Sequence, residues 1–346
     1  MGKYKILCVG PQWRGSNAGG LFRALSRTGN LIAVVDENYY INLSNKSTKI
    51  KALDKVFRAW HIQEFNQAII ESAHRFKPDF LLIYKGAFVL PATLHQLKSK
   101  GIKLVNFYPD VSFRTHGSLL QNTLPMYDQV FTTKTFGLRD MKDQLGITVA
   151  DFIPHGFDPD IHKPIADHFI NDTFLCDVSF IGGWSVKKES ILSGIKKALP
   201  NTTIKIWGSR WENCKIAALQ SSIQGTDILG DLYALGILSS KINLGLLHER
   251  VEGASSGDKI TSRTFHIPGT GGFMIHERTE EIVQYFEEDK EIVLFSEVSE
   301  LIEKIKYYLN HDSARKSIAE SGHQRALKEH SLDHRARLLI SKIEKL

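Results

Sequence analysis

The residues of this chain whose types and spacing could do chemistry lie mainly in its second half. Gly182 and Gly183 follow an apolar run, and Lys187 and Lys188 come just after them, at the start of a helical pattern. A glycine turn, a helix N-terminus and lysines together suit a diphosphate, because backbone N–H groups, the helix dipole and a mobile positive charge all attract an anion. Many strand-to-helix turns with solvated lysines look the same, so these residues alone leave both interpretations open.

A second candidate anion site lies between residues 258 and 275. There a polar loop leads into a short helical pattern with Arg263 in its first turn, and Gly271 and Gly272 follow before the next apolar run. A guanidinium can bind two phosphate oxygens at once, and glycines let a backbone approach a ligand closely. A surface loop followed by a tight turn explains the same residues equally well.

Three other signals are weaker. The loop at residues 10–20 is rich in glycine but lacks the G-x-G-x-x-G spacing, so Asp36 at the end of the second apolar run is interpreted as a loop residue and not as a ribose-binding acid. Asp158 and Asp160 spell D-x-D, but the prolines around them favour a linker. The cysteines and histidines have no metal-ligand spacing, so no metal site is predicted.

Composition limits the class of protein. The 346 residues are too many for one ordinary core and suit two domains. Apolar residues make up 42%, but no apolar run approaches the roughly 20 residues that a membrane span needs. Three widely spaced cysteines favour a reducing cytoplasm over a disulfide framework. The net charge of +6 indicates no nucleic-acid partner; it fits an anionic ligand or loose peripheral attachment to an acidic membrane surface.

The elements that must position these residues alternate along the first half. Short apolar runs are separated by longer amphipathic stretches, a pattern that indicates right-handed β-α-β units and a parallel sheet. We predict strands at residues 5–9, 31–35, 80–84, 103–107, 129–133 and 148–153, and helices at residues 20–27, 61–76, 92–100 and 136–145.

The alternation stops at residues 153–164, where three prolines in twelve residues allow neither regular element, and then restarts. The second half is therefore predicted to be another α/β domain. We predict strands at residues 177–181, 203–207, 242–246, 272–275 and 292–295, and helices at residues 187–199, 263–267, 280–286, 298–310, 313–329 and 334–344. In such a pair of domains we expect the ligand between them, against the carboxyl ends of the strands.

Residues 263–282 resemble a known family. Their sequence, RTFHIPGTGGFMIHERTEEI, is similar to the R-x-F-E-I-x-A-C-G-G-F-L-L-T-E pattern of the spore-maturation-protein (CgeB)-like glycosyltransferases, a branch of the group 1 sugar transferases of the GT-B fold. Residues 153–158 also resemble the P-x-G-V-D interdomain segment of group 1 enzymes. The resemblance continues in order over nearly all of the second half, at residues 177–182, 206–208, 240–243, 291–293, 305–309, 318–322 and 325–330.

The resemblance implies a fold and a role for each domain. The fold would be α/β, with two Rossmann-like parallel-sheet domains that face each other across a cleft and a C-terminal helix that crosses back. Residues 1–158 would form the acceptor-side domain, and residues 159–330 the domain that binds a nucleotide-sugar donor. Residues 331–346 would be the crossing helix, whose basic residues could flank a membrane-attached acceptor.

The resemblance also assigns residues to the donor. Group 1 enzymes carry an E-x7-E pair, whose second acid commonly holds the ribose, and Asp258 and His266 stand at the aligned positions. An imidazole thus replaces a carboxylate at the expected ribose contact. The other residues expected around the donor are Gly182, Gly183, Trp184, Lys187 and Lys188 at the diphosphate, Arg263, Thr264, Gly271 and Gly272 opposite, and Trp207 and Gly208 at the base.

The expected activity is transfer of a sugar from a nucleotide-diphosphate donor, with a UDP-sugar as first choice, to an acceptor left open among glycans, lipid-linked carriers, proteins and small molecules. The lysines at 187 and 188 and Arg263 could stabilise the leaving diphosphate, so no metal or other cofactor would be required. Asp110 and His155 are candidates for acceptor contacts or the base, with Asp258 as a further catalytic candidate; a turn aspartate and a linker histidine are their alternatives.

Other outcomes of the same resemblance stay open. The likeness to group 1 enzymes favours retention of the anomeric configuration. Because His266 replaces an acid, a catalytically inactive nucleotide-binding module of GT-B fold is one alternative function. A GT-B-fold epimerase, which would convert the nucleotide sugar without an acceptor, is another. The sequence carries no signal for an oligomeric state.

Overall fold

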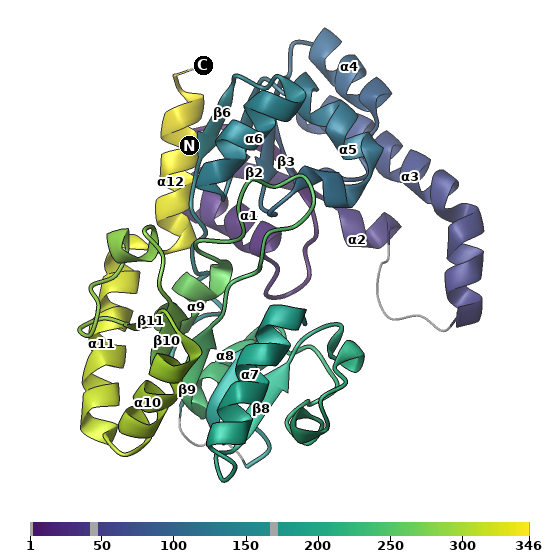
Figure 1. The fold of residues 1–346 in the computed structure, drawn as a ribbon. Coiled ribbons are helices and arrows are strands. Elements are labelled where there is room, and N and C mark those ends of the chain that lie inside the picture. The colour runs from purple at the N-terminus through teal and green to yellow at the C-terminus, as the bar shows by residue number, and fades with distance from the viewer. Residues whose placement is uncertain (1–2, 42–47, 167–171, 346) are drawn as a thin grey trace. The chain divides into compact units, whose positions relative to one another are not determined.

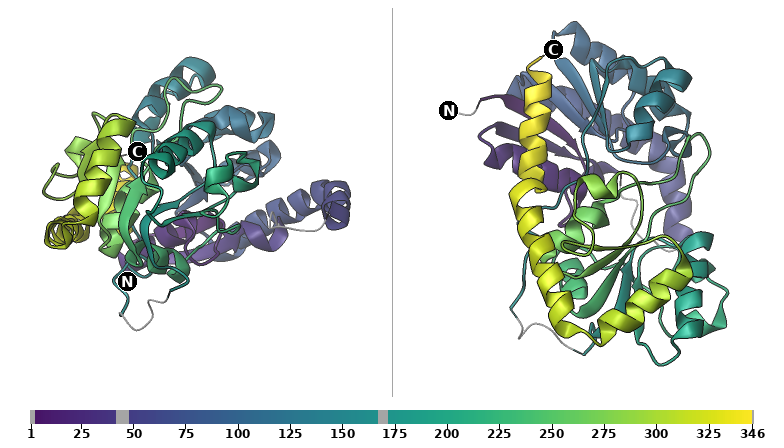
Figure 2. Two further views of the ribbon diagram at one scale, coloured as in Figure 1. Left: turned by 60° about the horizontal axis from the view of Figure 1, so that its bottom comes forward. Right: turned by 60° about the vertical axis from the view of Figure 1, so that its left-hand side comes forward.

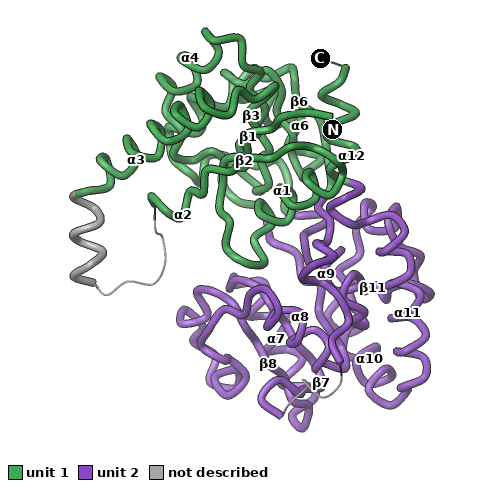
Figure 3. Tube along the Cα trace, turned by 180° about the vertical axis from the view of Figure 1, so that it is seen from behind, with its two compact units in different colours: residues 1–154, 250–257, 335–346 green, residues 155–249, 258–334 purple. Residues whose placement is uncertain are grey.

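The structure, a computed structural model, describes residues 3–41, 48–166 and 172–345 (Figure 1). The chain divides into two compact units (Figure 3). Unit 1 comprises Met1–Pro154, Arg250–Gly257 and Arg335–Leu346, and unit 2 comprises His155–Glu249 and Asp258–His334, so the chain passes between the units four times. Within the described residues, no helix combines the length and the apolarity that crossing a bilayer requires.

Unit 1 is built on a sheet of six parallel strands in the order β2-β1-β3-β4-β5-β6. The central strands β1 and β3 are buried at nearly every residue, as expected for parallel strands that are covered on both faces. The strands are β1 (Lys5–Gly10), β2 (Leu31–Asp36), β3 (Phe80–Tyr84), β4 (Lys103–Tyr108), β5 (Gln129–Thr132) and β6 (Ala150–Phe152).

Helices connect the strands of unit 1 and pack around its sheet (Figure 1). Local signals fix their ends: the Ser16 hydroxyl accepts the Gly19 N–H at 2.8 Å at the start of α1, and Gly146 ends α6 in the left-handed conformation. The helices are α1 (Asn17–Arg27), α2 (Glu37–Tyr40), α3 (Thr48–Phe76), α4 (Pro91–Ser99), α5 (Ser118–Thr123) and α6 (Thr135–Leu145), with the short 3₁₀ turns η1 (Phe113–His116) and η2 (Leu124–Met126).

The last helix, α12 (Leu332–Ile343), joins unit 1 from Arg335 onward. Its end lies beside β1 and β6 (Figure 2). The Lys342 ammonium lies 2.9 Å from the Asp151 carboxylate in β6, and the Tyr4 hydroxyl, just before β1, donates to Glu344 at 3.1 Å. The C-terminal segment is therefore part of unit 1 through specific side-chain contacts.

The loop Arg250–Gly257 also belongs to unit 1, although it interrupts the sequence of unit 2. The Ser112 hydroxyl and the Gln144 amide each donate to a carbonyl of this loop at 2.7 Å, and the buried Asp140 carboxylate accepts a loop N–H at 2.9 Å. Gly253 has a φ of +79° and packs so closely that an added Cβ would lie 2.5 Å from a neighbouring side chain. These contacts explain why a segment from the middle of the second half lies in unit 1.

Unit 2 is built on five parallel strands in the order β11-β10-β9-β7-β8. Its strands are β7 (Cys176–Ile181), β8 (Ile204–Trp207), β9 (Ser240–Gly245), β10 (Met274–Glu277) and β11 (Val293–Phe295). Its helices are α7 (Val186–Ala198), α8 (Asp231–Leu238), α9 (Ser262–Thr270), α10 (Val298–Leu309) and α11 (Asp312–Glu329), with 3₁₀ turns η4 (Trp211–Asn213), η5 (Ala217–Leu219) and η6 (Ile282–Gln284).

The two parallel sheets confirm the predicted fold class, but some predicted elements are wrong. The helix expected at residues 280–286 is only the 3₁₀ turn η6, because the chain turns at Asp289, with a φ of +59°, to enter β11. The strand expected at residues 272–275 begins at Met274, because α9 continues through Pro268 and Gly271 caps it at a φ of +93°. Helix α8 was not predicted.

The unit boundaries also differ from the domains expected at residues 1–158, 159–330 and 331–346. Residues 155–158 and 331–334 lie in unit 2, where Phe157 forms an isolated parallel bridge with Ser331. Gly269 of α9 packs directly on the Phe157 ring, and an added Cβ would lie 2.4 Å from it. The proline-rich segment is therefore held by the end of α11 and by α9.

Helix α11 packs on the backbone before β11 through Gly322. A Cβ at this position would lie 2.2 Å from the Glu291 carbonyl oxygen. Replacing a helical glycine by alanine normally stabilises a helix by about 1 kcal/mol, but overpacking costs about 1–3 kcal/mol. We expect Gly322→Ala to lower the free energy of unfolding of unit 2, measured by urea denaturation, whereas Ser317→Ala on the exposed face of α11 should not. Equal stability of the two variants would contradict this packing.

Candidate active site

The carboxyl edge of the unit 2 sheet is shaped by two glycines. Gly182 follows β7, and an added Cβ there would lie 2.6 Å from the Arg263 guanidinium and 2.9 Å from the Phe180 ring. Gly208 follows β8 at a φ of +138°, and an added Cβ would lie 2.1 Å from the Gly182 carbonyl oxygen. Both residues must lack a side chain, because the ends of two strands and a guanidinium meet there.

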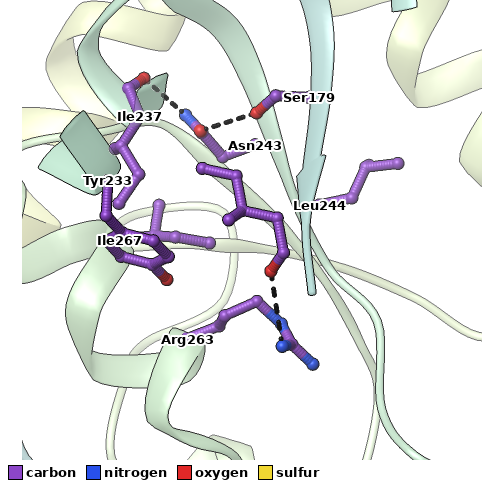
Figure 4. A pocket seen from close by; sticks show the side chains of 8 residues that line it. Ser179, Tyr233, Ile237, Asn243, Leu244, Arg263 and Ile267 are labelled. Carbon is purple, nitrogen blue, oxygen red and sulfur yellow. Dashed lines mark hydrogen bonds between the residues drawn. The ribbon is translucent and has the colours of Figure 1, made fainter. Parts of the chain in front are cut away.

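Arg263 lies in the first turn of α9 and reaches back to the strand ends (Figure 4). Its Nη2 donates to the Leu246 carbonyl at 2.7 Å and its Nη1 to the Ile181 carbonyl at 3.4 Å. The guanidinium carbon lies 5.2 Å from the centre of the Phe180 ring. Burial lowers the pKa of Arg263, but a guanidinium stays charged in proteins. A fixed positive charge therefore stands at the carboxyl edge of the sheet.

Lys188 places a second positive charge on the same ring. Its side chain is only 4% exposed, its ammonium lies 5.9 Å from the centre of the Phe180 ring, and it donates to the Gly183 carbonyl at 3.1 Å. Burial and then the charge of Arg263 lower the pKa of Lys188 to about 8. Within the described residues, the hydrogen bonds of both cations go to main-chain carbonyls, so their repulsion would be relieved by an anion.

Lys187 is held by a different partner. Its ammonium lies 2.5 Å from one oxygen of Glu277, at the end of β10, and the other oxygen of Glu277 accepts the Leu247 N–H at 2.7 Å. Glu277 thus links the neighbouring strand ends of β9 and β10 to the start of α7. Lys187 keeps its position at the edge, but with its charge balanced by a carboxylate.

The Thr264 side chain makes its hydrogen bonds inside unit 2. Its hydroxyl accepts the Thr261 N–H at 3.0 Å, which caps α9, and lies 2.9 Å from Nε2 of His276. Nδ1 of His276 lies 2.6 Å from the Glu277 carbonyl, which can only accept, so Nδ1 carries the proton and Nε2 accepts from Thr264. Burial lowers the pKa of His276 to about 4, which keeps this neutral tautomer.

His266 lies one turn further along α9 and stacks on the linker. Its ring centre is 3.8 Å from that of His162, and Tyr233 meets both rings edge-on. His162 accepts the Asp158 N–H through Nδ1 at 3.0 Å. Burial, followed by the neighbouring His162, holds the pKa of His266 well below its usual range, and within the described residues its Nε2 has no hydrogen-bond partner. The position thus offers a neutral imidazole nitrogen.

The small cavity behind Arg263 is a packing feature. Figure 4 shows Arg263 and Tyr233 at one side of it and the polar pair Ser179 and Asn243 at the other. Ser179 donates to Asn243 at 2.9 Å, and Asn243 donates to the Ile237 carbonyl at 3.1 Å. The cavity has no space for a water molecule, so ligand chemistry is expected only on the outer side of Arg263.

The predicted donor residues fall into two groups. The structure brings Gly182, Gly183, Lys187, Lys188, Gly208 and Arg263 to one edge of unit 2, and the charge of Asp258 acts on both Lys188 and Arg263. The other predicted residues lie away from this edge or make their contacts inside the unit. Gly271 and Gly272 lie at the opposite end of α9, about 13 Å along the helix from Arg263.

The remaining predicted residues are placed individually. Trp207 is 3% exposed and stacks on Phe174, and the Trp184 indole donates to Glu189. His155 is half-buried in unit 2 and contributes to the electrostatic environment of His266. Asp110 lies in unit 1, in a cluster described below.

Sequence reasoning missed Glu277, His162 and Tyr233. Glu277 corresponds to the last acid of the quoted family pattern, which is a signal for it. His162 and Tyr233 have no sequence signal, because they meet His266 only through folding.

Known proteins share this fold. The family model described as glycosyl transferase-like matches residues 187–341. The chain is similar to the solved structures of sucrose-phosphate synthase from Thermosynechococcus elongatus (11% identity, TM-score 0.69, 99% of both chains) and of HepE from Anabaena in complex with UDP-glucose (12% identity, TM-score 0.67, 99% of this chain and 100% of the other). It is also similar to a trehalose-6-phosphate synthase (11% identity, TM-score 0.59, 99% of both chains). No curated protein matches the sequence.

The similarity defines the class of fold. At these identities it shows the architecture alone: two parallel-sheet α/β domains of the GT-B type, as in glycosyltransferases. The family match adds that the second half is glycosyl transferase-like in sequence and covers Lys187, Lys188 and Arg263.

The role of Thr264 in the interior can be tested by stability. Thr264→Val removes the hydroxyl and leaves the Thr261 N–H and Nε2 of His276 buried without partners, at about 1–3 kcal/mol for each group. We expect Thr264→Val to lower the free energy of unfolding by at least about 1 kcal/mol in urea denaturation, and Thr264→Ser to restore most of it. An unchanged stability of Thr264→Val would contradict this assignment.

Proposed function

We propose that this chain is a glycosyltransferase that moves a sugar from a nucleotide-diphosphate donor to an acceptor hydroxyl. The observation that carries the proposal is the pair of cations, Lys188 and Arg263, that both lie within 6 Å of the centre of the Phe180 ring beside the Gly182–Gly183 turn. Their hydrogen bonds to main-chain carbonyls leave both charges available to a diphosphate. The GT-B architecture and the glycosyl transferase-like second half support the same class.

The charge arrangement suits the chemistry of a leaving diphosphate. When the bond between sugar and phosphate breaks, negative charge grows on the diphosphate and positive charge on the sugar ring. Fixed cations that face the diphosphate stabilise this charge without reorganising, which is the most effective way in which proteins lower such barriers. Lys188 and Arg263, with the N-terminus of α7, would supply this stabilisation, and Lys187 would add to it if the diphosphate displaces Glu277 from it, so we propose a metal-independent reaction.

A UDP-hexose is the donor that we propose to test first. HepE, of similar fold, has been solved in complex with UDP-glucose and with UDP. Trp207 and Gly208 end β8 next to Gly182, and we propose that the nucleotide base lies on this side. The Nε2 of His266 would accept or donate one hydrogen bond at a ribose hydroxyl, where a carboxylate could accept two.

We further propose that the anomeric configuration is retained. The similar trehalose-6-phosphate synthase was studied as an enzyme of glycosyl transfer with retention. The acceptor stays open among glycans, lipid-linked carriers, proteins and small molecules, and we propose that unit 1 binds it. NMR of the product's anomeric proton distinguishes retention from inversion.

His266 supports a second candidate function, a nucleotide-binding module without turnover. Its ring is neutral and stacked on His162, so the position lacks the carboxylate expected for a ribose. This candidate requires UDP binding with neither donor consumption nor sugar transfer. Release of UDP from UDP-glucose by the purified chain would exclude it.

Arg263 is the residue whose replacement tests the proposed function most directly. We expect Arg263→Met to weaken UDP binding at least tenfold in calorimetry and to lower donor turnover by about 10²–10³-fold, the usual loss on removing one charge-stabilising donor. Arg263→Lys should recover part of the affinity only, because an ammonium cannot bridge two carbonyls and a diphosphate as a guanidinium can. Arg139→Met, on the surface of unit 1, is the matched control. Wild-type UDP affinity in Arg263→Met would refute the proposal.

The lowered pKa of Lys188 predicts that the affinity for UDP depends on pH. Its pKa of about 8 in the free protein means that it is largely charged at pH 7 and largely neutral at pH 9. A bound diphosphate favours the charged form and raises this pKa, so UDP should bind most tightly below pH 8. Above pH 8 we expect the affinity to fall by up to about tenfold per pH unit, with uptake of one proton on binding.

Matched lysine variants isolate this effect. Lys188→Met should bind UDP more weakly and lose the pH dependence, whereas Lys197→Met, at the exposed end of α7, should keep both. Calorimetry between pH 6.5 and 9 in two buffers of different ionisation enthalpy measures the affinity and the proton uptake together. A flat profile in the wild-type chain would show that Lys188 does not contact the diphosphate.

A further inference from the structure

The carboxyl edge of the unit 1 sheet holds a second cluster of charged side chains. Lys85 follows β3, Asp110 follows β4, and His116 ends η1. The Lys85 ammonium and Nε2 of His116 each lie 2.9 Å from the same oxygen of Asp110, Oδ2. These side chains are 34%, 21% and 39% exposed for Lys85, His116 and Asp110, so the cluster is open to solvent on one side.

The backbone that carries Lys85 is held in an unusual conformation. Lys85 has a φ of +67°, which is rare for a residue with a side chain. Its N–H donates to the Phe107 carbonyl at 2.8 Å, and its carbonyl accepts from the Asn106 amide at 3.1 Å. Gly86 continues the turn at a φ of +83° in a space where an added Cβ would lie 2.9 Å from Ile83. Strained backbone of this kind persists where the surroundings enforce it, and it concentrates at functional sites.

Asp110 keeps one oxygen available. The Lys85 ammonium and the His116 imidazole both contact Oδ2, and within the described residues no partner is seen at Oδ1. Burial by itself raises the pKa of Asp110, but the contacts with His116 and Lys85 outweigh it and hold the pKa below its usual range. Asp110 is therefore a permanent acceptor and a poor base, so it is suited to holding a hydroxyl and unsuited to removing its proton.

A second carboxyl group lies at the same edge of the sheet, within range of the charge of Lys85. Glu37 begins α2, directly after β2, and burial raises its pKa to about 7 although the charge of Lys85 opposes the rise. Near neutral pH it can both donate and accept hydrogen bonds. Tyr84 and Phe107, the residues next to this edge in β3 and β4, are stacked with ring centres 5.4 Å apart. Both rings are buried, so they support the turns that carry the cluster.

The mixture of charges selects among classes of ligand. A phosphate would meet the carboxylate of Asp110, and an ammonium ligand would meet Lys85. A neutral ligand with neighbouring hydroxyl groups can donate to Oδ1 of Asp110 and accept from the ammonium of Lys85 with no uncompensated charge. The balance of the cluster therefore favours an uncharged polyhydroxyl compound over an ion.

We propose that Lys85, Asp110 and His116 form a binding site in unit 1 for the neighbouring hydroxyl groups of a sugar. The inference rests on the proposed glycosyl transfer, because it identifies the acceptor as a carbohydrate, or a carbohydrate-bearing molecule, bound through this sugar. Asp110 accepts from one hydroxyl through Oδ1, Lys85 donates to the next, and His116 positions the carboxylate through its contact with Oδ2. None of the three removes a proton. The site lies within unit 1 and uses residues of β3, β4 and η1 and the turns that follow them.

Binding can be measured without knowing the acceptor. The full chain is mixed with a panel of neutral monosaccharides, with orthophosphate and choline as arms for the other ligand classes, and binding is followed by saturation-transfer NMR. We expect at least one monosaccharide to bind the wild-type chain and to bind at least tenfold more weakly to Asp110→Asn and to His116→Gln. Asp143→Asn, a matched change on the surface of α6, should bind as the wild type does.

The outcomes separate this inference from the proposed function. UDP binding is measured on the same samples and should be equal in the wild type, Asp110→Asn and Asp143→Asn. If the wild type does not bind UDP, the glycosyl-transfer proposal is refuted, but sugar binding by unit 1 can still be measured. The inference is overturned if no panel sugar binds, if both Asp110→Asn and His116→Gln bind sugar as the wild type does, or if only orthophosphate or choline binds. Unchanged melting temperatures of the variants show that they are folded.

Discussion

The arrangement on which unit 2 depends is the meeting of two positive charges on one aromatic ring. Lys188 and Arg263 approach Phe180 within 6 Å of its centre, and both hydrogen-bond to carbonyls at the ends of strands. The cation–π contacts and the carbonyl oxygens offset part of the repulsion between the two cations. Each cation–π contact stabilises the folded unit by about 0.5–2 kcal/mol. The charge of Asp258, which acts on both cations, offsets a further part.

This arrangement requires glycine at two positions, Gly182 and Gly208. Any side chain at Gly182 would occupy the space of the guanidinium, and one at Gly208 would separate the ends of β7 and β8. Parallel strands bring their carboxyl ends to one edge, so residues remote in sequence meet there without any dedicated scaffold. The same geometry recurs in unit 1, where the turns after β3 and β4 bring Lys85 to Asp110. The two clusters differ in how the cations are held: Lys188 and Arg263 hydrogen-bond to main-chain carbonyls, whereas Lys85 pairs with the carboxylate of Asp110.

Much of the fold follows from local signals, and less of the site does. The strand Phe80–Tyr84 was predicted to the residue, because an apolar run is bounded by a proline before it and a polar turn after it. Lys188 and Arg263 were found because each begins a helix next to a glycine-rich turn. His116 could not be found in this way, because its significance arises only when η1 folds beside Asp110. Periodicity also misled: residues 280–286 have helical spacing, yet they complete only one 3₁₀ turn.

The loop Arg250–Gly257 has a consequence for recombining this architecture. Because it is encoded inside the second half but folds with the first, no single crossover point along the gene separates the two units. A chimera that took residues 155–334 from a homologous enzyme would import a loop whose Ser112, Asp140 and Gln144 partners stayed behind in the recipient. Exchange of unit 2 as a whole would therefore require two inserted segments, residues 155–249 and 258–334, with this loop kept from the recipient.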